Sequence, residues 1–142
     1  VCSEPQLDDF SNAKLATVCK GTELVYQWAK NIKGLKITYG TDLFFVPGEA
    51  ADEQAKMMER LLPWYEPVEI LRMATSTSGE LLKLSGPMRD PYLQGSLGLV
   101  AKGNYADLLL VDGNPLEDLG AVTDENNIRV IMKDGKIYKN TL

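Results

Sequence analysis

The residue types in this chain restrict the chemistry that it could perform. It has 142 residues, with no histidine and two cysteines, Cys2 and Cys19. Without an imidazole, a Ser-His-Asp triad, a Cys-His pair and a histidine-bound zinc are excluded within the chain. Chemistry here would have to come from carboxylates, lysines, tyrosines, hydroxyls or thiols. We expect the cysteines to be unlinked thiols, with a disulfide between them as the alternative.

One carboxylate, Asp42, stands where reacting groups are often found. It follows a short run of β-branched and aromatic residues at 35–39 and then a Gly-Thr pair. This pattern predicts a strand over 35–39, with an acidic side chain at its C-terminal end. Taken alone, the pattern favours an aspartate that only caps the next turn.

Helices dominate the part of the chain around this aspartate. Apolar residues at three- and four-residue steps predict a helix over 11–32, with Ser11 as N-cap and Gly34 just beyond its end. Further helices are predicted over 50–62, 67–74 and 77–84, the last opened by a Thr-x-x-Glu capping box. The strand at 35–39 would have no neighbour among these helices, and a lone strand is unstable.

The end of the chain is richer in strand signals. Short apolar runs predict strands at 98–100 and 106–111, and an Asp-Gly pair predicts a hairpin over 128–139. We therefore divide the chain into a helical part, residues 1–86, and a β-rich tail, residues 87–142.

Composition excludes several classes of partner. Net charge is −5, with 15 basic and 20 acidic residues, so nucleic acid is not expected as a partner. No run approaches the ~18 apolar residues that span a bilayer, so no membrane partner is expected. The chain begins with Val1 rather than methionine, and the compartment stays unknown.

Four segments, in order, resemble the amidohydrolase superfamily. Residues 36–42 (KITYGTD) resemble its last barrel strand, and 69–75 (EILRMAT) the helix that follows. Residues 98–116 resemble its Gly-rich turn and Ala-Asp-Leu strand, and 130–136 its closing Gly-Lys hairpin. The imidazolonepropionase-like and Xaa-Pro dipeptidase-like branches are the most similar.

The resemblance implies an α/β fold. The chain would be the C-terminal portion of a (β/α)8 barrel, namely the last strand and its helices, plus strands of a small composite β-sandwich. The strand at 35–39 would find its neighbours in the missing N-terminal part of the barrel. That part, or a second copy of the chain, is the expected macromolecular partner.

The resemblance also implies an activity, hydrolysis of a C–N bond in a dipeptide or N-acyl amino acid. Divalent metal ions, usually zinc, would be held by upstream histidines, and none is expected on this chain alone. Asp42 would transfer protons and touch the metal. Phe44 and Phe45 in the next loop would either gate the substrate or only pack within the loop. On this interpretation the isolated chain is inactive.

Two alternatives stay open. The chain could be a non-catalytic α+β module for structure or partner binding that keeps the motifs only as scaffold. It could instead belong to a hydantoinase-type hydrolase of cyclic amides, which shares the fold.

Overall fold

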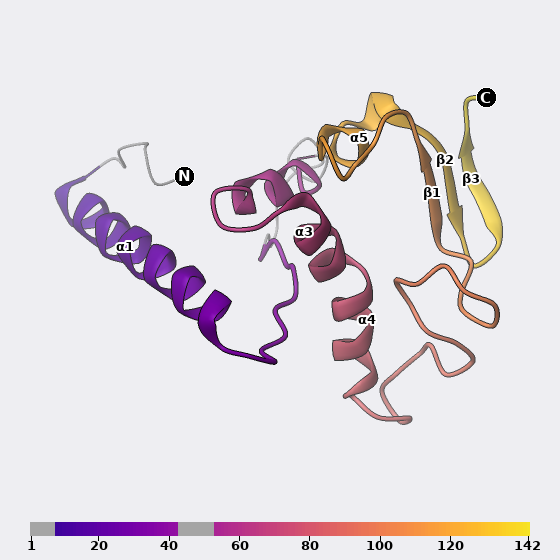
Figure 1. The fold of residues 1–142 in the computed structure, drawn as a ribbon, viewed down its shortest axis with the longest axis horizontal. Coiled ribbons are helices and arrows are strands. Elements are labelled where there is room, and N and C mark those ends of the chain that lie inside the picture. The colour runs from indigo at the N-terminus through magenta and orange to yellow at the C-terminus, as the bar shows by residue number, and fades with distance from the viewer. Residues whose placement is uncertain (1–7, 43–52) are drawn as a thin grey trace. The chain divides into compact units, whose positions relative to one another are not determined.

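The computed structural model describes residues 8–42 and 53–142, and these form two compact units (Figure 1). The first unit ends at Leu35 and the second comprises Lys36–Leu142. The boundary that the sequence suggested between residues 86 and 87 stays a prediction. Within the described ranges, no helix combines the length and hydrophobicity needed to cross a membrane.

The first unit is built around the long helix α1, Asp9–Asn31, which confirms the helix predicted there. Its N-cap is Asp8 and not Ser11: the Asp8 carboxylate accepts hydrogen bonds from the Ser11 backbone N–H (2.9 Å) and hydroxyl (2.8 Å). The acidic side chain accepts a hydrogen bond from a free N–H of the first turn. Its negative charge also interacts favourably with the partial positive charge of the helix N-terminus. Gly34 has a φ of 81°, in the turn that ends the helix.

Cys19 lies on α1 and is disulfide-bonded, so the preference for unlinked thiols is wrong. Its bonding partner lies outside the described residues. The spacing of two cysteines in a sequence does not report the distance between their side chains, which decides whether a disulfide forms.

The strand predicted over 35–39 is not formed, and residues 35–42 belong to no sheet. The Tyr39 N–H instead donates to the carbonyl of Met73 (3.2 Å). A β-rich sequence can form a strand only where another strand supplies backbone partners.

Three short helices follow in the second unit. They are the 3-10 helix η1 (Lys56–Leu61) and the α-helices α3 (Pro67–Ala74) and α4 (Ser76–Lys83). α3 confirms the prediction, whereas the helix expected over 50–62 appears in the described residues only as η1. The capping box predicted at Thr77 is wrong, because α4 already begins at Ser76. A capping box is found instead at α3, where the Glu69 carboxylate accepts the Glu66 N–H (2.9 Å).

The core of the second unit lies among these helices and not in the sheet. Its two most deeply buried large side chains are Ile70 of α3 and Leu119, with 0% and 2% exposure. Leu119 precedes the one-turn helix α5, Gly120–Thr123, which the sequence did not predict. The other buried apolar side chains are Leu61, Tyr65, Met73 and Ala121.

Three antiparallel strands form the sheet, in the order β1 (Leu108–Val111), β2 (Ile128–Lys133) and β3 (Lys136–Asn140). The predicted hairpin is confirmed: Asp134 and Gly135 have φ values of 50° and 74°, the pair of positive angles of a tight hairpin turn. The strand expected over 98–100 is not formed, and Gly98 has a φ of 75°.

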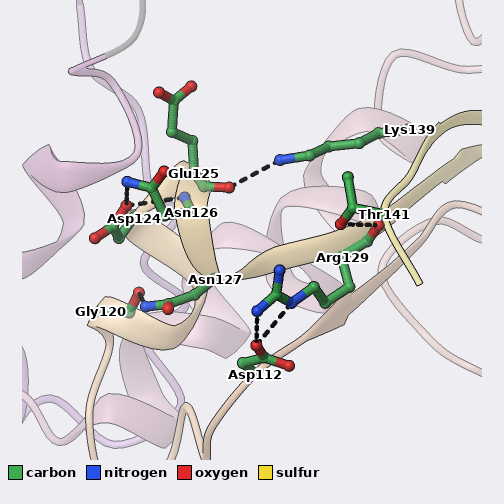
Figure 2. A network of polar contacts seen from close by, with 9 residues as sticks. All are labelled: Asp112, Gly120, Asp124, Glu125, Asn126, Asn127, Arg129, Lys139 and Thr141. Atoms are coloured by element: carbon green, nitrogen blue, oxygen red, sulfur yellow. Dashed lines mark hydrogen bonds and ion pairs between the residues drawn. The ribbon is translucent and has the colours of Figure 1, made fainter.

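A polar network joins the sheet to the loop before β2 (Figure 2). The Arg129 guanidinium on β2 donates to the Asp112 carboxylate, with the Nε atom 2.7 Å from Oδ2. The Asn127 side chain donates to the Gly120 carbonyl (3.0 Å), and the Lys139 ammonium on β3 donates to the Glu125 carbonyl (2.9 Å). The bond from Lys139 holds the short 3-10 helix η2, Glu125–Asn127, against β3, and the bond from Asn127 joins it to α5.

Candidate functional site

Asp42 ends the segment that carries the proposed chemistry, and its backbone is unusual. It has a φ of 54°, and among the described residues only Asp134 shares a positive φ without being glycine. This conformation costs a side-chain-bearing residue about 1–2 kcal/mol, although aspartate tolerates it better than most. Its side chain is exposed. Strained backbone often accompanies a functional role, so the angle is consistent with chemistry at Asp42.

The segment that carries Asp42 is held against the helices of the second unit by three contacts. The Tyr39 backbone N–H donates to the Met73 carbonyl (3.2 Å) at the C-terminal end of α3. The Tyr39 hydroxyl donates to the Gln54 carbonyl (2.7 Å). The Lys36 ammonium forms an ion pair with the Glu80 carboxylate on α4. Asp42 therefore ends a segment, residues 36–42, that is attached at two of its seven residues.

The surroundings of Tyr39 change the pKa of its phenol. Partial burial raises its pKa above the usual 10.0, and the positive charge of Arg60 partly opposes that rise. The phenol therefore keeps its proton at neutral pH and remains a hydrogen-bond donor. Nothing in the sequence indicates its bond to Gln54, because the two residues are 15 positions apart.

The residues present do not form a metal site by themselves. Among the described residues, no three His, Cys, Asp or Glu side chains are grouped closely enough to hold an ion. Histidine is absent from the whole chain, and zinc sites need three or four ligands. Asp42 could supply one carboxylate ligand, but the described part of the chain does not fit a metal.

The other residues considered from the sequence fall outside this site or outside the described ranges. Phe44 and Phe45, the predicted gating residues, lie in 43–52 and so outside the described residues. Asp107, next to β1, accepts the Asp134 backbone N–H (2.7 Å) through its carboxylate. This bond gives Asp107 a structural role at the hairpin turn.

Comparison with known proteins identifies the family of the chain. The sequence model of the amidohydrolase family matches residues 9–138, which is most of the chain. No protein with a curated description gives a significant match.

Solved structures agree with this match. An amidohydrolase is 34% identical over 96% of this chain (TM-score 0.72), and a prolidase complexed with N-methylphosphonate-L-proline is 31% identical over 94% (TM-score 0.73). Ochratoxinase from A. niger is 27% identical over 97% (TM-score 0.74). The chain spans only 29–30% of the length of these three structures. By the extent of the sequence match and the level of identity, the chain belongs to the amidohydrolase family.

Proposed function

We propose that this chain is the C-terminal part of a metal-dependent amidohydrolase that hydrolyses a C–N bond in a dipeptide or N-acyl amino acid. The observation that carries the proposal is the family match over residues 9–138, which includes the Gly-Thr-Asp sequence ending at Asp42. Similar structures include a prolidase and a Xaa-Pro dipeptidase with bound methionine, 31% and 27% identical to this chain. Both names describe proteins that act on short peptides, which favours a substrate of that class.

Asp42 is the proton-transfer residue in this proposal. Its exposed carboxylate would accept a proton from the attacking water, whose oxygen then bonds to the substrate carbonyl carbon. The proton would pass to the leaving nitrogen as the C–N bond breaks, which returns Asp42 to its ionised form. Water adds across the bond, and the products are a carboxylic acid and an amine.

The fold of the complete protein is proposed as a (β/α)8 barrel with a small β-sandwich. In this proposal the segment 36–42 is the last barrel strand, and the remaining barrel supplies both its strand partners and the ligands of a divalent metal, zinc being the usual one. Such a metal would supply an activated water at neutral pH. The exposed apolar side chains of β1 are consistent with a further layer of polypeptide over the sheet.

A substitution at Asp42 tests its role in the complete protein that carries this segment. Asp42→Asn keeps the size and the tolerance of positive φ but cannot accept the proton. We expect kcat for dipeptide hydrolysis to fall by about 10²–10⁴-fold. Asp134→Asn is the matched control, because it makes the same change at the other aspartate with positive φ and should leave kcat unchanged. Equal activity of Asp42→Asn and wild type would refute the role.

The 142-residue chain gives a second test. Because its described residues hold no cluster of three metal ligands and the chain has no histidine, calorimetric titration with zinc should show no binding below micromolar concentrations. Dipeptide hydrolysis should also be absent. Tight zinc binding, or turnover by the isolated chain, would contradict the proposal that the metal ligands lie elsewhere.

A further inference from the structure

Tyr39 makes two contacts that bear on where Asp42 lies. It is three residues before Asp42, and its backbone and its side chain bind different elements of the second unit. The third contact of the segment, between Lys36 and Glu80, joins side chains that are 68% and 56% exposed. Exposed ion pairs of this kind contribute little to stability, so the two bonds of Tyr39 are the stronger attachment.

The backbone bond of Tyr39 ends on a well-fixed acceptor. The carbonyl of Met73 accepts the Tyr39 N–H and also the Ser78 hydroxyl (2.6 Å). Met73 is buried, with 7% exposure, and lies in the last turn of α3. Carbonyls at a helix C-terminus lack partners within the helix, so this one is free to receive both donors.

The side-chain bond of Tyr39 joins it to a residue that lies beyond Asp42 in the sequence. Its acceptor, the carbonyl of Gln54, lies two residues before η1 begins at Lys56. In the sequence Tyr39 precedes residues 43–52 and Gln54 follows them, and the hydroxyl of Tyr39 bonds to the carbonyl of Gln54. The half-buried phenol donates in this bond, because a carbonyl oxygen can only accept.

We infer that Tyr39 is a positioning residue for Asp42: it ties the segment before Asp42 to the end of α3 and, through its hydroxyl, to the chain just before η1. This inference rests on the proposed function, in which Asp42 transfers the proton. Orientation of a reacting group matters strongly for rate, because small displacements from a productive geometry are costly. Tyr39 itself need not touch the substrate.

Removal of the hydroxyl tests this role in the complete protein. Tyr39→Phe keeps the ring and the backbone bond but loses the bond to Gln54. We expect kcat to fall about 10-fold while KM stays unchanged, because the hydroxyl acts on the position of Asp42 and not on substrate binding. A merely structural role would reduce the amount of folded enzyme and leave kcat per folded molecule as in wild type. The matched control is Tyr138→Phe, at a tyrosine that is 63% exposed on β3, which should behave as wild type.

Amide hydrogen exchange of the 142-residue chain provides a readout that does not depend on activity. In Tyr39→Phe the amide of residue 39 should exchange about 5-fold faster than in wild type or Tyr138→Phe, because the segment loses one of its two strong attachments. Unchanged exchange, or an unchanged kcat of the complete protein, overturns the inference. If the complete wild-type protein is inactive, the proposed function is overturned instead, and exchange still decides whether the hydroxyl fixes the segment.

Discussion

Two aspartates of this chain share a backbone conformation but differ in what surrounds them. Asp134 and Asp42 have φ values of 50° and 54°. At Asp134 the hairpin requires this angle, and the carboxylate of Asp107 accepts its N–H. Asp42 belongs to no such hairpin among the described residues. A local turn therefore explains the angle at Asp134, whereas for the angle at Asp42 a functional role is our proposal.

The strain at Asp42 can be measured. Asp42→Gly removes the side chain at a positive φ, so we expect the free energy of unfolding to rise by about 1 kcal/mol in urea denaturation of the chain. Asp134→Gly is the matched comparison and should stabilise by a similar amount. A loss of stability in Asp42→Gly alone would mean that its carboxylate makes a stabilising contact, which would favour a capping role.

The ion pair between Asp112 and Arg129 predicts a pH dependence. The hydrogen bond from Arg129 holds the pKa of Asp112 below its usual 3.8. A lowered folded-state pKa contributes stability above the unfolded pKa, and that contribution is lost as the pH falls through the folded value. The Tm difference between wild type and Asp112→Asn should therefore be constant at neutral pH and shrink below 3.8.

The matched control for this titration is Glu125→Gln, because the Glu125 carboxylate makes no contact within the network of Figure 2. Its Tm difference from wild type should show no such change around pH 3.8. A difference for Asp112→Asn that persists in acid would mean that the side chain stabilises through shape and not through charge.

At the scale of elements, the sequence correctly predicted the helices and turns that depend on residues close together in the chain. Helix α3 begins with Pro67 in its first turn, and the hairpin turns at Asp134 and Gly135. The predictions of strands at 35–39 and 98–100 were wrong, because strand formation depends on a partner strand that the local sequence does not specify. For the site, the role of Asp42 stays a prediction, and the bond from Tyr39 to Gln54 was not predicted because it depends on folding between positions far apart.

Gly98 lies where a predicted strand is not formed, and it makes a close approach to another part of the chain. It has a φ of 75°, and an added Cβ atom would overlap the backbone of Thr75, between α3 and α4. Gly135 has nearly the same φ, 74°, but an added Cβ would meet no atom within 4 Å. Gly98 therefore allows the chain to pass close to the junction of two helices, which a strand at that position would not do.

This pair of glycines predicts different costs for the same substitution. Gly135→Ala should destabilise the chain by about 1–2 kcal/mol, the cost of a positive φ alone. Gly98→Ala carries that cost and a backbone overlap as well, so we expect a loss larger by at least about 1 kcal/mol. Urea denaturation of both variants measures the difference. Equal losses would mean that the loop moves away from Thr75 without cost.

At the scale of the whole chain, much apolar surface stays exposed in each unit. In the first unit Phe10, Val25 and Trp28 on α1 are 80%, 56% and 61% exposed. In the second unit Leu109 and Leu110 of β1 are 53% and 50% exposed. Neighbouring residues on a strand point to opposite faces, so β1 presents leucine on both faces of the sheet. Its outer edge also has no strand partner among the described residues.

This surface predicts that the 142-residue chain self-associates. An unpaired apolar edge strand is a template for pairing with another chain. Light scattering should give a mass above 15.7 kDa that rises with concentration. Leu109→Lys, which puts a charge on the edge strand, should lower that mass, whereas Leu142→Lys at the exposed C-terminus should not. A monomer at every concentration would show that the exposed leucines do not drive association.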